Sequence, residues 1–223
     1  MARQKYRNLR NEEIGQLIMQ GCVCQDWNLV EVTENFLPES VKKSTFSGHI
    51  KIGRYDDEIV LFGGVRAKTG IYNAYLHNCT VSDNVLISNV KSYIANYNIG
   101  ERVVIHNINQ LAVEGRSSFG NGTVVKVINE SGGREIPIYD HLSAHVAYIL
   151  ALYRHRRKAV EVLEKFVSDY VSFISDTKGE VGTGVKIINC DSIRNVKIGP
   201  NASLEGVAKL VNGSINSSVS DPV

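Results

Sequence analysis

The chain has 223 residues and a hydrophobic content of 43%, which suits one large or two modest globular domains. Its 25 Lys and Arg residues nearly balance 23 Asp and Glu residues, so the composition predicts neither a nucleic acid nor an anionic membrane surface as a partner. No apolar run approaches the roughly 20 residues that a membrane-spanning helix needs.

The N-terminal segment, Met1 to Arg10, is polar and basic and is not followed by an apolar core, so it does not read as a secretory signal. The cysteines Cys22, Cys24, Cys79 and Cys190 are scattered through apolar contexts and form no disulfide framework. Both observations predict a cytoplasmic protein. No second Cys or His pair lies at a usable spacing for zinc, so no metal site is expected.

A short helix is predicted from Asn11 to Gln20, with Asn11 as its N-cap and Gly21 directly after its end. Trp27, the single tryptophan, is expected to plug the open end of a repeat fold, as atypical terminal elements do. Residues 1–45 are therefore assigned to an N-terminal helix and cap.

Between Val81 and Leu111 a large aliphatic or aromatic residue returns at every sixth position. Neither an amphipathic helix nor a half-buried strand has this period, whereas hexapeptide repeats of a parallel β-helix do. Each repeat makes one short strand and one tight corner. Gly100 and Asp83-Asn84 suit such corners because these residue types tolerate positive φ. The residues expected to face the interior are Val81, Ile87, Tyr93, Ile99, Ile105 and Leu111.

The period begins irregularly at Phe46, resumes at Val65 after an interruption, and is lost after Leu111. It returns at Val181 and continues to the last residues without a capping element. We therefore predict a first part of the β-helix at 46–114 and a second, truncated part at 181–223.

Residues 115–180 are predicted to form an insertion between coils. Thr123 to Asn129 and Ile136 to Tyr139 read as a hairpin around the turn Ser131 to Glu135. Beyond it, apolar residues at helical spacing up to about Ser175 predict one long helix, or two helices joined near Arg154 to Arg157.

The hexads resemble those of hexapeptide acyltransferases and of the C-terminal halves of sugar-1-phosphate nucleotidyltransferases. Four motifs also resemble the N-terminal part of a family of large uncharacterised bacterial hexapeptide-repeat proteins: Gly132 to Glu135, Ser143 to Tyr148, Leu152 to Arg157 and Asn212 to Asn216. The resemblance implies a mainly β fold, a left-handed parallel β-helix with an N-terminal helix and an inserted hairpin plus long α-helix. It also implies a homotrimer.

The same resemblance implies a transferase acting on a nucleotide-sugar or sugar-phosphate substrate, with acyl transfer from a coenzyme A thioester as the leading reaction. Such enzymes use a histidine as general base. His141 and His145 are four residues apart and share one face at the start of the predicted helix, which makes them the catalytic candidates. Candidate substrate-binding residues are Arg134, Glu135, Asn121, His77 and Arg154.

Simpler explanations stand beside these assignments. His141 and His145 suit helix capping and surface exposure, and Arg154 to Lys158 suits a solvated helix face. The alternative function is a non-catalytic β-helix module for binding or oligomerisation within a larger protein. Convergence of Arg134, Glu135, His141 and His145 on one pocket would favour the enzyme, whereas scatter would favour the module.

Overall fold

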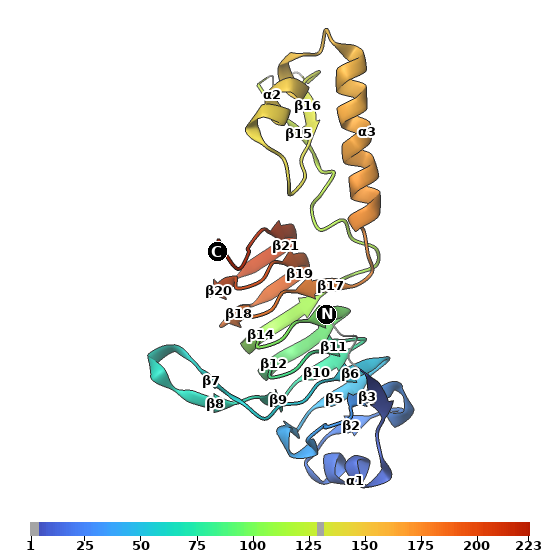
Figure 1. Ribbon diagram of the computed structural model, residues 1–223, viewed down its shortest axis with the longest axis vertical. Coiled ribbons are helices and arrows are strands. Elements are labelled where there is room, and N and C mark those ends of the chain that lie inside the picture. Colours follow the sequence, from blue (N-terminus) through green and yellow to red (C-terminus); the bar gives the residue numbers. More distant parts are fainter. Residues whose placement is uncertain (1–4, 129–131) are drawn as a thin grey trace.

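The computed structural model describes residues 5–128 and 132–223. Within these ranges the chain is mainly β, and most strands belong to one large curled sheet stacked along the long axis of the molecule (Figure 1). The first residues of the basic N-terminal segment, and Ser131 of the predicted turn, lie outside the described ranges. No helix in the described parts is long and apolar enough to cross a membrane.

Helix α1 (Asn11–Met19) lies across one end of the stack, and its Leu17 is fully buried in the main core (Figure 1). The predicted N-cap is wrong by one residue: Arg10 precedes the helix, and Asn11 is its first residue. The Arg10 N–H donates to the Glu13 carboxylate at 2.8 Å, which places a negative charge at the helix N-terminus.

Parallel strand pairing begins earlier than the expected start at Phe46, because three strands of the N-terminal segment already pair with later ones. Trp27 lies in the 3-10 helix η1 (Trp27–Leu29), and its ring packs edge-on against Phe46 at 6.4 Å in the core. A second 3-10 helix, η2 (Pro38–Ser40), follows. The strands are β1 (Tyr6–Asn8), antiparallel to β3 (Val30–Thr33), and the parallel pairs of β2 (Val23–Cys24) with β5 (Thr45–Ser47), β3 with β6 (Ile50–Ile52), and β4 (Val41–Lys42) with β9 (Gly70–Tyr72).

After the inserted segment, paired strands lie seventeen residues apart in sequence, as Ile187 and Leu204 do. Before it, the regular offset between parallel paired strands is eighteen residues, as for Val81 with Ile99 and Ile87 with Ile105. This offset equals three six-residue units. The strands concerned are β10 (Tyr75–His77), β11 (Thr80–Val81), β12 (Leu86–Ala95), β13 (Tyr97–Ile99) and β14 (Val104–Ala112), then β17 (Gly179–Val181), β18 (Lys186–Ile188), β19 (Ser192–Ile198), β20 (Ser203–Glu205) and β21 (Lys209–Ile215).

Within the regular run from Val81 to Leu111, the predicted interior position Tyr93 is wrong. Ile94 is fully buried, whereas Tyr93 is partly exposed, and its hydroxyl accepts a hydrogen bond from Gln110 Nε2 at 2.7 Å. The pairing of β12 with β14 contains an irregularity between Val90 and Tyr93, so the next interior residue comes one position later. Six-residue spacing returns from Ile99 to Ile105, both of which are buried.

The corners contain residues with left-handed backbone, as predicted. Asn84 is one of them, whereas Gly100 is not. At one corner, Asn84, Arg102, Gly184 and Asn201 all have positive φ. The last three each donate a backbone N–H to the preceding coil, at 2.8 to 3.2 Å. Gly100 instead avoids a clash, because a Cβ there would lie 2.8 Å from the Thr183 nitrogen of the next coil.

The interruption after Ile52 is an antiparallel hairpin that projects from the stack (Figure 1). Val65, predicted to face the interior, lies in the turn of this hairpin and is 59% exposed. Ile59 folds back onto the outer face of the coils and packs against Leu86, Val104 and Ile188. The hairpin consists of β7 (Glu58–Val60), η3 (Phe62–Gly64) and β8 (Arg66–Lys68).

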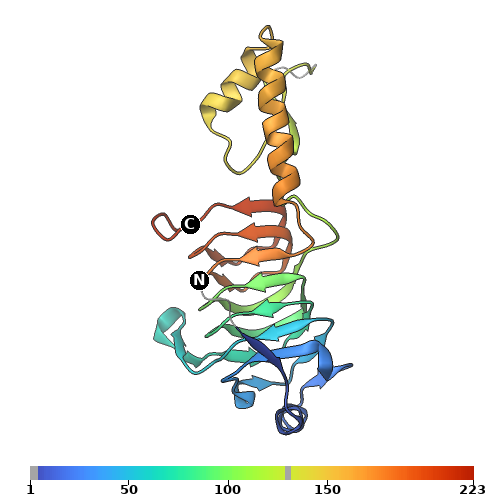
Figure 2. The same cartoon turned by 45° about the vertical axis from the view of Figure 1, so that its right-hand side comes forward.

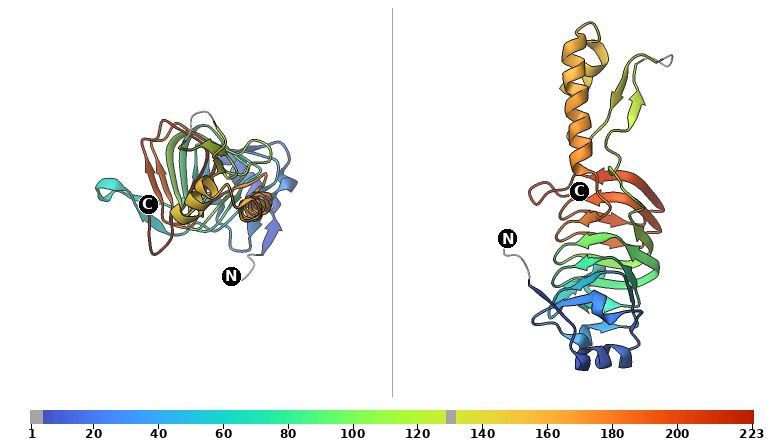
Figure 3. Two further views of the ribbon diagram at one scale, coloured as in Figure 1. Left: turned by 90° about the horizontal axis from the view of Figure 1, so that it is seen from above. Right: turned by 90° about the vertical axis from the view of Figure 1, so that its right-hand side faces the viewer.

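The inserted segment forms an arm that extends beyond the β21 end of the stack (Figures 2 and 3). Two helices are present, joined around Arg154, which agrees with the second of the two predicted alternatives. A small core of Ile136, Leu150, Ala151 and Val160 holds the arm together. The arm consists of the hairpin strands β15 (Val124–Lys126) and β16 (Glu135–Pro137), then α2 (Ala144–Leu152) and α3 (Arg157–Ile174).

Candidate functional site

The arm meets the stack at a junction between residues 119–121 and strand β21. Phe119 is buried in the main core, and a Cβ on Gly120 would lie 2.5 Å from the Asn212 carbonyl oxygen. The chain therefore passes close against the last coil before it enters the arm. This approach fixes the base of the arm, as does the antiparallel bridge of Ser117 with Asp176.

Asn121, a predicted substrate-binding residue, is buried in this junction and its amide is fully engaged. Its Nδ2 donates to the Ser118 carbonyl at 2.9 Å and to Ser214 Oγ at 3.1 Å, while its Oδ1 accepts from the Asp140 N–H at 2.7 Å. The side chain thus connects the entry of the arm, the last strand and the segment before α2. Its contacts are those of a structural residue.

Beside Asn121 lies a hollow of about 200 Å³. Asp140 faces it, with a side chain that is only 12% exposed, and Asp140 Oδ1 accepts a hydrogen bond from the Tyr170 hydroxyl at 2.7 Å. Burial, together with this bond to a carboxylate, raises the pKa of Tyr170 to about 12. The hollow is lined by Phe119, Gly120, Asn121, Ile138, Tyr139, Asp140, Asn212, Gly213 and Ser214.

His141, the first catalytic candidate, stands at the edge of this junction. Its Nε2 lies 3.9 Å from Asp140 Oδ1, and its ring packs edge-on against Tyr170 with centroids 5.7 Å apart. The side chain is 73% exposed and does not line the hollow. A carboxylate beside an exposed imidazole can orient a general base, which makes Asp140, His141 and Tyr170 the nearest approach to a catalytic cluster among the candidates.

His145, the second catalytic candidate, belongs to a different surface. It lies exposed on α2 and lines an open apolar depression of about 550 Å³ with Tyr148 and Tyr153. The two histidines are close in sequence, but His141 precedes the helix and His145 lies within its first turn. The prediction that both share one helix face is therefore wrong.

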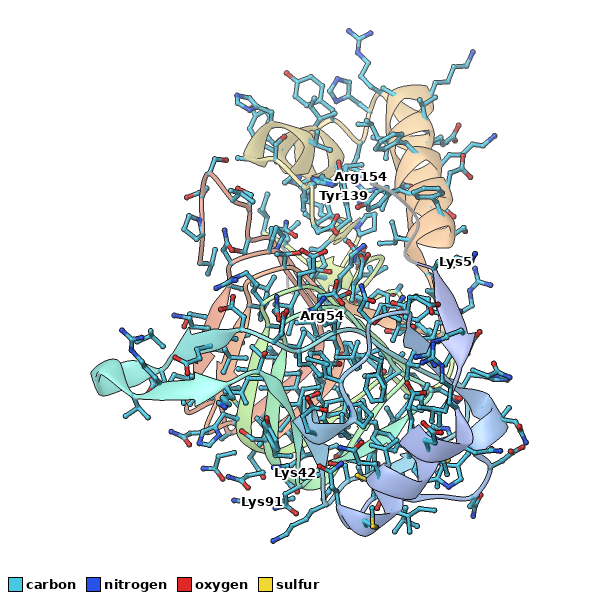
Figure 4. All side chains as sticks on the ribbon, turned by 60° about the horizontal axis from the view of Figure 1, so that its bottom comes forward. Lys5, Lys42, Arg54, Lys91, Tyr139 and Arg154 are labelled. Atoms are coloured by element: carbon cyan, nitrogen blue, oxygen red, sulfur yellow. The ribbon has the colours of Figure 1, made fainter. Side chains whose placement is uncertain are left out.

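Arg154, which is labelled in Figure 4, joins two parts of the arm. Its guanidinium donates to the backbone carbonyl of Glu135 in β16 and forms an ion pair with Glu164 of α3, Nη1 to Oε1, at 3.1 Å. Since the group is used within the fold, it offers little to a substrate phosphate.

Arg134 lies in the turn that leads into β16, and Glu135 is the first residue of that strand. Both carboxylate oxygens of Glu135 accept from the Gly133 N–H at 3.0 Å. Hydrogen bonds from its own backbone N–H and from that of Gly133 lower the pKa of this carboxyl group. Neither Glu135 nor Arg134 lines the hollow beside Asn121.

His77 lies on the face of the stack, where its hydrogen-bond partners indicate its tautomer. Asn78 Oδ1 accepts from the His49 N–H at 3.0 Å, so Asn78 Nδ2 is the amide group that faces His77 Nε2, at 2.9 Å. Nε2 must then accept, and Nδ1 carries the proton toward Ser47 Oγ at 2.8 Å. Because both ring nitrogens are satisfied, His77 holds two coils together and is not available as a base.

The candidates therefore occupy four separate places: the junction, the outer face of α2, the start of β16 with Arg154 bonded to it, and the face of the stack. The junction also contains residues that sequence reasoning missed, since Tyr170 lies 30 positions from Asp140 and Ser214 lies 93 from Asn121. No local motif links residues at such separations. Among the described residues no group of three or more His, Cys, Asp or Glu side chains is arranged to hold a metal ion.

Comparison with known proteins places the chain in a family. A family model described as "Domain of unknown function (DUF4954)" matches residues 6–223. The chain belongs to this family. It is also similar to an uncharacterised protein of Treponema pallidum (strain Nichols), with 28% identity over 228 residues. The alignment covers 97% of this DUF4954 chain and 31% of that relative, so the chain spans about a third of the relative's length.

Proposed function

We propose that this DUF4954 chain is a non-catalytic binding and oligomerisation module. The observation that supports this proposal most strongly is the scatter of the candidate residues, because a catalytic site requires its groups within reach of one substrate. Arg154 and Asn121 are committed to internal contacts, and His145 lies apart from His141. The arm then becomes the element that distinguishes this chain from a plain stack of coils.

The proposal includes the finer fold assignment, a left-handed parallel β-helix of the hexapeptide-repeat type. Support comes from the offset of seventeen or eighteen residues between paired strands and from the column of left-handed residues at a corner. A rigid stack of this kind holds an inserted element at a fixed position. Three-fold assembly of the coils and a cytoplasmic location remain predictions from the sequence.

A thermal-shift screen tests the proposal. The purified protein is heated with nucleotide sugars, sugar phosphates and acetyl coenzyme A, since a ligand that binds only the folded state raises the melting temperature. We expect no shift with any of them. A shift that His141→Ala abolishes, while Val65→Ser leaves it intact, would refute the module and restore the enzyme.

The alternative proposal is a hexapeptide-repeat transferase whose general base is His141, oriented by Asp140. The 3.9 Å approach of Nε2 to the carboxylate is the observation in its favour. The adjoining hollow of about 200 Å³ is smaller than the roughly 300 to 1,000 Å³ of typical ligand pockets, so a coenzyme A thioester does not fit it within one chain. This alternative therefore requires a neighbouring subunit to complete the pocket.

A further inference from the structure

Helix α3 carries two apolar faces: one is buried within the arm, and the other is largely exposed, although the ring of its Phe166 packs edge-on against Tyr139 with centroids 6.4 Å apart. Val160 and Val167 are buried against the arm. On another side of the helix Val162, Phe166 and Phe173 are 68%, 58% and 85% exposed. An isolated exposed apolar residue is ordinary, but three on one stripe of an exposed helix indicate a contact surface.

The stripe has the spacing of a coiled-coil seam. Val162, Phe166, Asp169 and Phe173 follow one another at intervals of four, three and four residues, which are the alternating a and d positions of a heptad. We define these four residues as the α3 seam. Helices that pack side by side as a coiled coil use this repeat, whereas a face that only contacts solvent has no need of it.

We propose that the α3 seam docks against the α3 seam of a second copy of this chain, with the two helices antiparallel. This inference rests on the proposed function, since it names the partner of the arm. The antiparallel arrangement places Val162 opposite Phe173 of the second copy, and Phe166 opposite its Asp169. The pair is two-fold symmetric and closes on itself.

Charge selects this orientation over a parallel one. A parallel pair or trimer in register would bring the Asp169 carboxylates together in an apolar seam, which is unfavourable. In the antiparallel pair, Lys165 of each helix lies across from Asp169 of the other. Neither side chain forms an ion pair with any residue in the described ranges, and both are exposed.

The shape of the molecule leaves room for an antiparallel pair of α3 helices. Helix α3 runs along the long axis and stands beyond the last coil (Figures 1 and 3). An antiparallel partner therefore places its own stack at the opposite end of the pair, where the two stacks do not collide.

The size of the seam predicts a weak complex. A covered phenylalanine ring buries about 150 to 250 Å², so the seam removes on the order of 800 Å² counted over both copies. This is below the roughly 1,200 to 2,000 Å² of stable interfaces, and we expect a dimer that forms in the micromolar range.

Sedimentation velocity of the 223-residue chain between about 5 and 200 µM tests the proposal. We expect the mass to rise from that of the 24.7 kDa monomer toward a dimer. Val162→Ser should weaken the dimer about tenfold, and Val65→Ser, which removes a similarly exposed valine from the β7–β8 hairpin, should leave it unchanged. Unchanged melting temperatures establish that both variants fold. The two-fold dimer competes with the homotrimer that the sequence resemblance implies, so a trimer would overturn the proposal, as would a monomer throughout or equal effects of the two variants.

Orientation is tested by charge exchange and by cross-linking. Asp169→Lys should weaken the dimer, and Lys165→Glu added to it should restore association.

Under oxidation a mixture of Val162→Cys and Phe173→Cys proteins should form the mixed disulfide, whereas self-linked Val162→Cys would show parallel helices and refute the arrangement. If the protein sediments as a monomer and no ligand changes its melting temperature, the dimer is refuted and the non-catalytic module is not. If a ligand raises the melting temperature and His141→Ala abolishes this rise, the module itself is refuted.

Discussion

The hydroxyl of Tyr97 connects two coils through the interior of the stack: it donates to the backbone carbonyl of Val196 at 2.7 Å and accepts from the Val196 N–H at 3.3 Å. Tyr97 is fully buried, and burial raises the pKa of its phenol. The bond joins residues 99 positions apart, on either side of the arm in sequence. It ties the coils before the insertion to those after it.

Tyr97→Phe should therefore lower the free energy of unfolding by about 1 to 3 kcal/mol, because it leaves two buried backbone groups without a partner. Tyr93→Phe removes a hydroxyl from a partly exposed ring and should change stability by less than about 0.5 kcal/mol. Urea unfolding measures both. Equal losses would contradict the interior role of Tyr97.

The interior register is tested by placing a carboxylate at neighbouring positions. Ile94→Asp and Ile99→Asp should prevent folding, because each buries an unpaired charge among the coils. Tyr93→Asp should give a folded protein, since its side chain lies partly in solvent. Circular dichroism with thermal melting distinguishes them, and a cooperative transition in Ile94→Asp would show that the register is wrong.

Close packing of the coils is tested at two glycines. A Cβ on Gly182 would lie 2.5 Å from the Pro200 nitrogen, whereas one on Gly213 would meet no atom within 4 Å. Gly182→Ala should cost about 1 to 3 kcal/mol through overpacking, and Gly213→Ala should be near neutral. Denaturant unfolding of the pair gives the comparison, and a neutral Gly182→Ala would argue against coil contact at this corner.

Acid should weaken the α1 end of the stack. Arg7 hydrogen-bonds the Glu13 carboxylate at 2.7 Å and lowers its pKa. The stabilisation from a lowered pKa is complete above the unfolded value of about 4.3 and is lost as pH falls through the folded value. Melting temperatures of Glu13→Gln should consequently depend less on pH below about 5 than those of wild type. Glu12→Gln, in the same turn and exposed, should keep the wild-type profile.

Two substitutions at the junction test which of its residues supports the fold, the buried Asn121 or the exposed His141. Asn121→Ala leaves the Asp140 N–H without its partner and removes the side-chain bonds to Ser118 and Ser214, so it should lower the free energy of unfolding by about 1 to 3 kcal/mol. His141→Ala removes a largely exposed ring and should melt like wild type. Calorimetry compares the two variants, and a strong destabilisation by His141→Ala would mean that its contact with Tyr170 supports the arm.

The sequence alone determined the repeat, because the six-residue period of apolar residues reports a local alternation of strand and corner. The same is true of the inserted arm, where the repeat stops and helical spacing begins. Tertiary structure decided the rest. The slip from Tyr93 to Ile94, the left-handed Arg102 and the use of Arg154 as an internal tie depend on which coil or helix lies alongside. The junction of Asn121, Asp140 and Tyr170 likewise brings together residues whose separation in sequence leaves no periodic signal.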